Sequence, residues 1–256
     1  MAVDNARLYA ESQQAIRARD EFLSIASHEL RTPLTGIKGY AQILLRAQSR
    51  GQLDDERLLR SLATIDDAAD RLAALVDDLL DVSRIRTGHL PLRLSTVDLV
   101  ATLREVTEQY HDHLGDQHQL VMELPDEPLH VEVDVDRLEQ VVTNLLSNAV
   151  KYSPSGGAVR LSLVGGDGGA LVQVTDSGIG LPTESLEAIF QPFGRAPNAT
   201  RRSLPGMGLG LYICRTLIER HGGRIWATSG GENSGTTFGF WLPIPERVPT
   251  LEHARA

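Results

Sequence analysis

The first third of the chain has hydrophobic residues at the spacing of an α-helix. Residues 5–86 contain one proline, Pro33, and apolar residues recur there every seven positions in two series. A polar stretch, residues 48–55, separates the series and predicts a turn between two helices. Two helices alone bury such stripes poorly, so we expect two chains to form a homodimeric four-helix bundle. The two series are Leu23, Leu30, Ile37 and Leu44, then Leu58, Ile65, Leu72 and Leu79.

Beyond Gly88 the pattern changes to short β-like runs mixed with helical ones. This mixture predicts an α+β fold in which helices pack on one face of a sheet. The whole chain should therefore be a helical hairpin followed by a two-layer α/β sandwich, with the boundary near residues 87–95. The expected strands are residues 119–124, 129–133, 158–164, 170–175, 224–228 and 236–242, and the expected helices are residues 99–114, 135–152 and 209–221.

Composition narrows the function classes. The 256 residues are 41% hydrophobic, enough for packed cores, and the net charge of −9 argues against binding to nucleic acid or to an anionic membrane. No apolar stretch approaches the roughly 18 residues that span a bilayer, and the N-terminus lacks a signal-peptide pattern. We therefore expect a cytoplasmic chain that does not insert into membranes. The single cysteine, Cys214, lies in an apolar run and should be a buried structural thiol.

A histidine beside an acidic residue marks the first predicted helix. His28 lies off the apolar series, in the segment Ser-His-Glu-Leu-Arg-Thr-Pro-Leu, and should face solvent. Imidazole is a nucleophile near neutral pH, and the carboxylate of Glu29 can accept its other ring proton. Thr32, four residues on, shares the helical face of His28, and Pro33 should kink or loosen the helix there. Taken alone, an exposed His–Glu pair is more often an ordinary helix surface.

The predicted helix at residues 135–152 carries polar residues on one face. Asn144, Asn148, Lys151 and Tyr152 fall on this face. Two amides and an ammonium group suit a hydrated Mg²⁺ and phosphate oxygens, because Mg²⁺ prefers oxygen ligands and retains several waters. The alternative is a polar, solvated helix face. Asparagine is a poor helix former, so two at this spacing weakly favour a functional role.

Two glycine motifs follow. Asp176 ends a strand-like run and precedes Gly178 and Gly180, an arrangement that can bind an exocyclic amino group or can be a simple turn. The segment Gly-x-Gly-x-Gly at residues 206–210 opens a helical run, where backbone N–H groups can bind phosphate. Each motif is weak evidence by itself.

The order of these motifs resembles that of the sensor histidine kinases of two-component systems. His-Glu-Leu-Arg-Thr-Pro is followed by Asn-x-x-x-Asn-x-x-Lys-Tyr, Asp-x-Gly-x-Gly, Ile-Phe-Gln-Pro-Phe-Gly-Arg, Gly-x-Gly-x-Gly and Gly-Thr-Thr-Phe. The resemblance covers residues 20–243. It implies a dimeric helical hairpin that carries a phospho-accepting histidine, followed by an ATP-binding α/β sandwich of the type shared with gyrase. The family often has an aromatic residue after Phe193, where this chain has Gly194.

The resemblance implies a role for each motif residue. His28 would be the phospho-acceptor, Glu29 the base, and Thr32 the hydroxyl that positions water in a phosphatase reaction on the partner. Asp176 would bind the adenine amino group. The other residues would bind ATP and Mg²⁺. Asn148 would be the metal ligand, Asn144 and Lys151 would contact the phosphates, and Arg195 would reach the γ-phosphate. Tyr152, Gly178 and Gly180 would surround the adenine, and Gly206, Gly208 and Gly210 would form a lid.

The implied reaction is ATP-dependent autophosphorylation of His28, then transfer to an aspartate in the receiver domain of a response regulator, with phosphatase activity on that regulator. There are two alternatives: a degenerate scaffold that binds ATP without turnover, and a gyrase-type ATPase. The intact motif residues argue against the scaffold, and the exposed His–Glu pair argues against the ATPase. The expected domains are a signalling helix similar to the end of a GAF domain at residues 1–19, a phosphotransfer domain at 20–88, a catalytic domain at 89–246 and a tail at 247–256.

Overall fold

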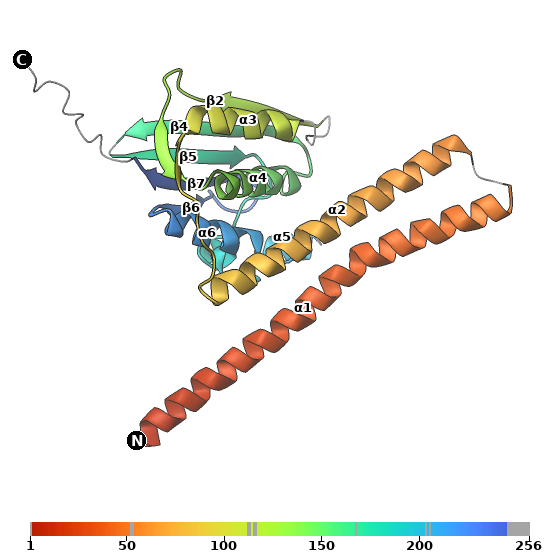
Figure 1. Ribbon diagram of the computed structural model, residues 1–256, viewed down its shortest axis with the longest axis horizontal. Helices are drawn as coiled ribbons and strands as arrows, with labels where there is room; N and C mark the ends of the chain where they lie inside the picture. Colours follow the sequence, from red (N-terminus) through yellow and green to blue (C-terminus); the bar gives the residue numbers. More distant parts are fainter. Residues whose placement is uncertain are drawn as a thin grey trace, which may run out of the picture. The chain divides into compact units, whose positions relative to one another are not determined.

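Two long helices, α1 (Ala2–Ser49) and α2 (Asp55–Arg86), lie side by side in the computed structural model (Figure 1). The chain divides into two compact units, Met1–His89 and Leu90–Ala256. The side chain of Leu23, and the expected tail at residues 247–256, fall outside the described parts. The structure describes residues 2–51, 54–111, 114, 117–166, 168–202, 204 and 206–244. For residues 2–12, 14–23 and 111 it describes the backbone but not the side chains.

The hairpin predicted from the two hydrophobic series is confirmed. Asp54 caps the start of α2, where its side chain accepts a hydrogen bond of 2.7 Å from the backbone N–H of Arg57. Pro33 is buried within α1, and the helix continues on both sides of it. None of the described helices is both long and apolar enough to cross a bilayer.

The second unit contains a five-stranded sheet and a separate two-stranded one. The larger sheet has the order β2-β4-β5-β7-β6, in which β2 and β4 are parallel and all other neighbours are antiparallel. The smaller sheet pairs β1 and β3 antiparallel. The strands are β1 (Ser95–Asp98), β2 (His118–Glu123), β3 (His130–Val133), β4 (Gly157–Gly166), β5 (Gly169–Asp176), β6 (Arg224–Thr228) and β7 (Thr236–Pro243).

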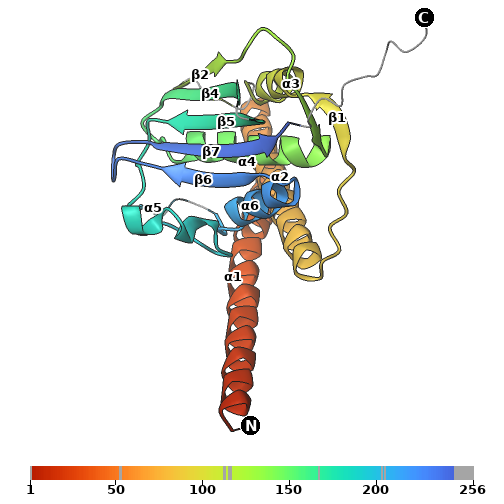
Figure 2. The same ribbon diagram turned by 90° about the vertical axis from the view of Figure 1, so that its left-hand side faces the viewer.

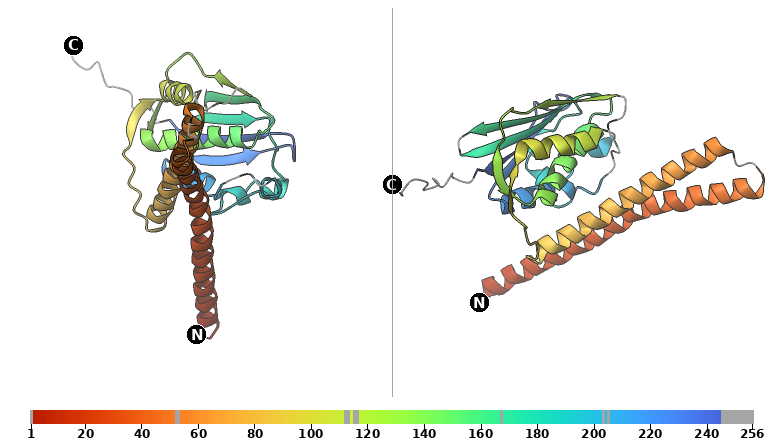
Figure 3. Two further views of the ribbon diagram at one scale, coloured as in Figure 1. Left: turned by 90° about the vertical axis from the view of Figure 1, so that its right-hand side faces the viewer. Right: turned by 45° about the horizontal axis from the view of Figure 1, so that its top comes forward.

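Three helices cover one face of the larger sheet (Figures 2 and 3): α3 (Leu99–His111), α4 (Val135–Lys151) and α6 (Gly210–Arg220). Alternate strand residues point into this interface, so Val172 and Val174 of β5 and Phe238 and Phe240 of β7 are buried. Cys214 of α6 is buried among them, as predicted. The predicted two-layer arrangement, a sheet with helices on one face, is therefore confirmed. Shorter elements are α5 (Pro197–Arg201) and two 3₁₀ helices, Thr183–Ser185 and Ala188–Phe190.

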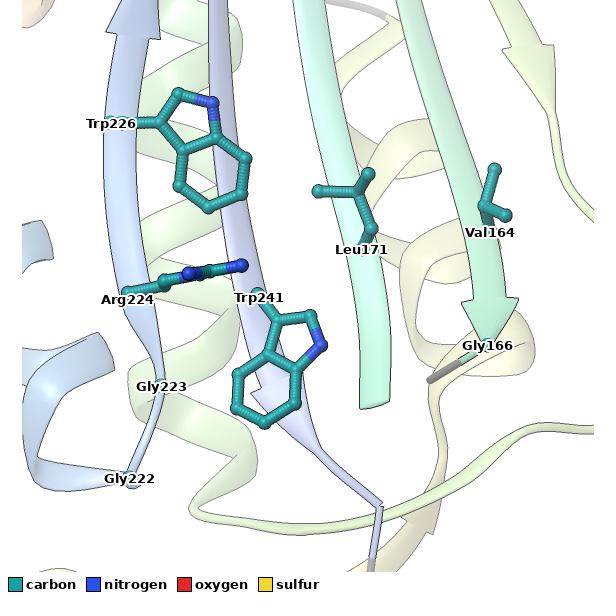
Figure 4. A pocket seen from close by; sticks show the side chains of 8 residues that line it. All are labelled: Val164, Gly166, Leu171, Gly222, Gly223, Arg224, Trp226 and Trp241. Carbon is teal, nitrogen blue, oxygen red and sulfur yellow. The ribbon is translucent and has the colours of Figure 1, made fainter. Parts of the chain in front are cut away.

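The opposite face of the sheet carries an aromatic hollow of about 550 Å³ (Figure 4). The guanidinium group of Arg224 lies 5.5 Å from the ring centroid of Trp226 and 6.0 Å from that of Trp241. Such cation–π contacts hold the two rings in place on the sheet surface. The hollow lies where β5 begins, beside Leu171, and therefore at the opposite end of that strand from Asp176.

Candidate functional site

Asp176 ends β5 and is buried, with 6% of its surface exposed. Its Oδ1 accepts hydrogen bonds from the backbone N–H groups of Gly178, at 2.8 Å, and Thr236, at 3.2 Å. Burial raises the pKa of this carboxyl to about 6, while the two backbone hydrogen bonds act in the opposite direction. The carboxylate is therefore fixed in orientation and is ionised at neutral pH.

The two glycines after Asp176 are required by close backbone approaches. A Cβ atom at Gly178 would overlap the carbonyl oxygen of Tyr152 and lie 2.7 Å from the hydroxyl of Ser153. Gly180 has a φ angle of 62°, and a side chain there would overlap the carbonyl oxygen of Gly231. The loop after β5, residues 177–181, is thus held between the end of α4 and the turn after β6. We call it the base loop.

The polar face of α4 forms as predicted. The side-chain amide of Asn148 donates to Oδ1 of Asn144 at 2.8 Å, one helical turn apart. Lys151 lies at the end of the helix, with its Nζ atom 4.5 Å from the ring centroid of Tyr152. Asp134 begins the helix, where its side chain accepts from the backbone N–H of Arg137. Two amides and one ammonium group are therefore neighbours on one helical face.

The Gly-x-Gly-x-Gly segment runs along this polar face. A Cβ atom at Gly206 would lie 2.6 Å from Nζ of Lys151, and one at Gly210 would overlap the side-chain amide of Asn144. Gly208 has a φ angle of 74° and packs on the backbone of Phe193. The N-terminus of α6, which starts at Gly210, is thereby placed beside the amides of α4. Backbone N–H groups at such a helix start attract anions.

Arg195 lies at the rim of the same region. One guanidinium nitrogen donates to the carbonyl oxygen of Leu204, and its Nε is buried without a partner among the described residues. Gly194, where the family often has an aromatic residue, packs so closely on the backbone of Ala188 that no side chain fits. A cavity beside Arg195 and Gly194 is lined by Tyr152, Asp176, Gly180, Asn198 and Phe238, among others.

Four of the predicted nucleotide-site residues, Tyr152, Asp176, Gly180 and Arg195, line this cavity. Asn144, Asn148 and Lys151 lie together on α4, with Gly206 against Lys151 and Gly210 against Asn144. The structure adds Asn198, which the motifs do not mark. Asn198 is 3% exposed and donates hydrogen bonds to the carbonyl oxygens of Ile179, at 3.3 Å, and Gly180, at 2.9 Å. An asparagine in a polar loop carries no periodic signal, so only the fold reveals that it is buried.

His28 belongs to the other unit and lies on α1. Its side chain is 78% exposed, and its Nδ1 atom is 3.6 Å from Oε1 of Glu29, whose side chain is 27% exposed. The hydroxyl of Thr32 donates to the backbone carbonyl of His28 at 3.3 Å, so both lie on the same helical face. An accessible imidazole beside a carboxylate is the geometry that a nucleophilic histidine needs.

Two family models match the chain. Residues 18–88 match the His Kinase A (phospho-acceptor) domain, and residues 133–246 match the histidine kinase-, DNA gyrase B- and HSP90-like ATPases. The sensor histidine kinase WalK of Bacillus subtilis is 36% identical over 240 residues, which are 92% of this chain and 38% of WalK. The chain spans at most two-fifths of the length of the curated relatives it matches.

Solved structures agree in both units. The catalytic domain of the histidine kinase ThkA is 32% identical, with a TM-score of 0.52, over 59% of this chain and 98% of that domain. ThkA in complex with the response regulator protein TrrA is 27% identical, with a TM-score of 0.64, over 91% of this chain and 64% of that one. The phospho-acceptor and ATPase domains in this order, with the likeness to ThkA, show that the chain belongs to the sensor histidine kinases of two-component systems.

Proposed function

We propose that this chain transfers the γ-phosphoryl group of ATP to His28 and then to an aspartate in the receiver domain of a response regulator. The observation that carries the proposal is the buried carboxylate of Asp176 in a cavity that Tyr152 also lines, because Tyr152 directly follows the end of α4, the helix whose face bears Asn144, Asn148 and Lys151. A nucleotide site of this kind supplies the phosphoryl donor. The exposed imidazole of His28 supplies an acceptor.

Each end of ATP has matching groups in this site. The ionised Asp176 accepts a hydrogen bond from the adenine amino group, and the buried Nε–H of Arg195 offers a donor for the γ-phosphate. Lys151 and the N-terminus of α6 attract the other phosphates. Asn148 donates through its nitrogen to Asn144, which leaves its oxygen to coordinate Mg²⁺. A Mg²⁺ ion held there would supply positive charge to the phosphate oxygens.

The geometry around His28 assigns a task to each ring nitrogen. Glu29 approaches Nδ1, so Nδ1–H is the proton that the carboxylate orients and accepts. Nε2 is then the atom that attacks the γ-phosphorus, while the bond from that phosphorus to the bridging oxygen of ADP breaks. In the onward transfer, an aspartate carboxylate oxygen of the receiver domain attacks the same phosphorus, and the bond from phosphorus to Nε2 breaks.

We also propose that two copies of the hairpin pair into a four-helix bundle. Leu62 and Val76 of the second helix are 47% and 42% exposed in the single chain, and Ala69 between them is exposed as well. These three residues follow one another every seven positions and form a continuous apolar stripe on α2. A second hairpin would cover this stripe.

The domain organisation follows from these assignments. Residues 20–88 carry phosphotransfer and dimerisation, residues 89–246 bind ATP, and residues 1–19 continue α1 as a signalling helix from a sensor. The response regulator TrrA is bound to ThkA in a solved structure, which supports a receiver domain as partner here. ATP and such regulators meet in the cytoplasm, where we place this chain.

Incubation with γ-labelled ATP and Mg²⁺ tests the proposal directly. We expect a labelled protein whose phosphoryl bond is labile in acid and stable in base, and loss of this label when a cognate receiver domain is added. A chain that binds ATP and takes no label would be the scaffold. A chain that releases phosphate without forming a phosphoprotein would be a gyrase-type ATPase.

Asp176→Asn is expected to weaken ATP binding by roughly 5–150-fold, which corresponds to a misfit buried polar contact of about 1–3 kcal/mol. The side-chain oxygen of the asparagine can still accept from the backbone N–H groups of Gly178 and Thr236. Its side-chain NH₂ group then faces the amino group of adenine, so that two hydrogen-bond donors meet. GTP should bind poorly to the wild-type chain, since its ring presents a carbonyl there. Isothermal titration measures both. Equal affinity for ATP and GTP would contradict this role.

The same carboxyl gives ATP binding a pH dependence. Its pKa is raised to about 6, and only the ionised form accepts the amino group. Affinity should therefore be constant at higher pH and fall as the pH is lowered through about 6. Asp176→Asn, which does not titrate, should lose this dependence and serves as the control.

Thr32→Ala is expected to slow dephosphorylation of the response regulator by at least about tenfold, because the hydroxyl that orients the attacking water is lost. Autophosphorylation should remain nearly unchanged. Thr35→Ala is the matched control: it removes a similar exposed hydroxyl, bonded to the carbonyl of Arg31 at 2.7 Å, on the same helix. Loss of both activities in a folded Thr32→Ala chain would mean that Thr32 supports the helix instead.

A further inference from the structure

One wall of the adenine cavity comes from a helix that is too short to be stable alone. This helix, α5 (Pro197–Arg201), has five residues and contributes Asn198 and Ala199 to the cavity lining. Isolated helices below about 12 residues are marginal even with favourable sequences. The position of α5 therefore depends on its contacts with the rest of the domain.

Asn198 makes the buried contact of α5 with the base loop. Its side-chain nitrogen donates to the carbonyl oxygens of Ile179 and Gly180, and its side-chain oxygen accepts from the backbone N–H of Ala199 at 3.1 Å. The side-chain nitrogen of Asn198 thus bonds the base loop, and its side-chain oxygen bonds α5 itself. Because the side chain is only 3% exposed, water cannot replace these hydrogen bonds.

The turn between β6 and β7, residues 229–235, joins the same cluster. The backbone N–H of Asn233 donates to the carbonyl oxygen of Ile179 at 2.7 Å, and that of Gly235 donates to Gly178 at 3.1 Å. The base loop therefore accepts hydrogen bonds both from this turn and from Asn198. Ile179 receives a hydrogen bond from both.

Two arginines add an outer contact between α5 and this turn. Arg201 pairs with Glu232 at 2.6 Å, and the guanidinium group of Arg202 donates to the side-chain oxygen of Asn233 at 2.9 Å. Both arginines are exposed, as is Glu232. Exposed ion pairs contribute little, because water competes for both partners. Among these polar contacts of α5, the buried amide of Asn198 is therefore the strongest.

We propose that Asn198 is a positioning residue that holds α5 as a wall of the adenine cavity and thereby sets the apparent affinity for ATP. The inference rests on the proposed ATP-binding function. A ligand binds only to the fraction of molecules whose site is complete, and its apparent dissociation constant is the intrinsic one divided by that fraction. Loss of the two hydrogen bonds lowers this fraction. Saturating ATP restores it, so KM changes and kcat does not.

Asn198→Asp and Asn198→Ala test the proposal in the full chain. Aspartate keeps the size and the acceptor for Ala199, and replaces only the donor with an oxygen that repels the two carbonyl oxygens. We expect both variants to raise KM for ATP in autophosphorylation by about tenfold, equivalent to about 1.4 kcal/mol, with kcat unchanged. The dissociation constant for ATP, measured by titration, should rise in parallel. Arg201→Gln, which removes only the exposed ion pair, should change KM less than about threefold.

Three outcomes would overturn the proposal. A wild-type KM in Asn198→Asp would show that the donor is irrelevant. A reduced kcat with unchanged KM would place the effect outside the cavity wall. If the variants unfold at a lower temperature, and the fraction unfolded at the assay temperature is large enough to explain the rise in KM, Asn198 is a structural residue. If the wild-type chain binds ATP and takes no label, the proposed kinase function fails, while the dissociation constants still decide the role of Asn198.

Discussion

His28→Gln is expected to take no label from ATP, under conditions in which the wild-type chain is labelled. Glutamine keeps a polar side chain of similar length at an exposed helical position, so the hairpin should fold as before. Its amide nitrogen is not a nucleophile at neutral pH, because its lone pair is delocalised into the carbonyl group. The loss should be complete. The measurement is ATP-dependent phosphorylation, with circular dichroism to verify the helix content.

ATP affinity is the control for this substitution. His28 belongs to the hairpin unit, whereas the predicted nucleotide-binding residues lie in the second unit. We therefore expect the dissociation constant for ATP to stay at the wild-type value in His28→Gln. Labelling comparable to the wild type would show that another residue is the acceptor, and would end the assignment of His28.

Glu29→Ala is expected to slow autophosphorylation at saturating ATP by about 10²–10⁴-fold, the usual range for loss of a general base. Oε1 of Glu29 is the carboxylate oxygen next to Nδ1 of His28, at 3.6 Å, and can accept the proton that leaves the ring as Nε2 attacks. The effect should appear in kcat, since Glu29 belongs to the hairpin unit and the residues assigned to ATP binding belong to the second unit. Single-turnover labelling rates measure it.

Glu29→Gln separates proton transfer from orientation of the ring. The amide oxygen can still accept a hydrogen bond from Nδ1–H, although it cannot take up the proton. If Glu29 acts as a base, both variants should be slow. A glutamine variant with the wild-type rate would instead mean that Glu29 only orients the imidazole, and the proton would leave to water.

The sequence predicts the parts of the fold that depend on local pattern. The hairpin and the strands of the large sheet follow from hydrophobic periods of seven and two, which reflect burial on one face of a helix or strand. The observed strand β6 has the predicted bounds, Arg224–Thr228. Helical spacing likewise predicted that Asn144, Asn148 and Lys151 share one face of α4. The role of each residue in binding ATP came instead from the resemblance to the kinase family.

Features that depend on contacts between distant segments were not predicted. The strand β1 is only four residues long, and the antiparallel partner that stabilises it, β3, begins more than thirty residues later. The helix α5 was not predicted, because no apolar period marks five residues. Asn198 meets Ile179 and Gly180 across a gap of almost twenty positions. Such pairs become visible only when the backbone is folded.

The Trp–Arg–Trp cluster on the open face of the sheet makes the two units spectroscopically distinct. Trp226 and Trp241 are the only tryptophans in the sequence, and both belong to the second unit. Intrinsic indole fluorescence therefore reports unfolding of this unit alone, and the hairpin contributes no tryptophan signal. Far-ultraviolet circular dichroism contains the signal of all helices, including the two long ones of the hairpin. Two melting curves that differ between these probes would show that the units unfold independently.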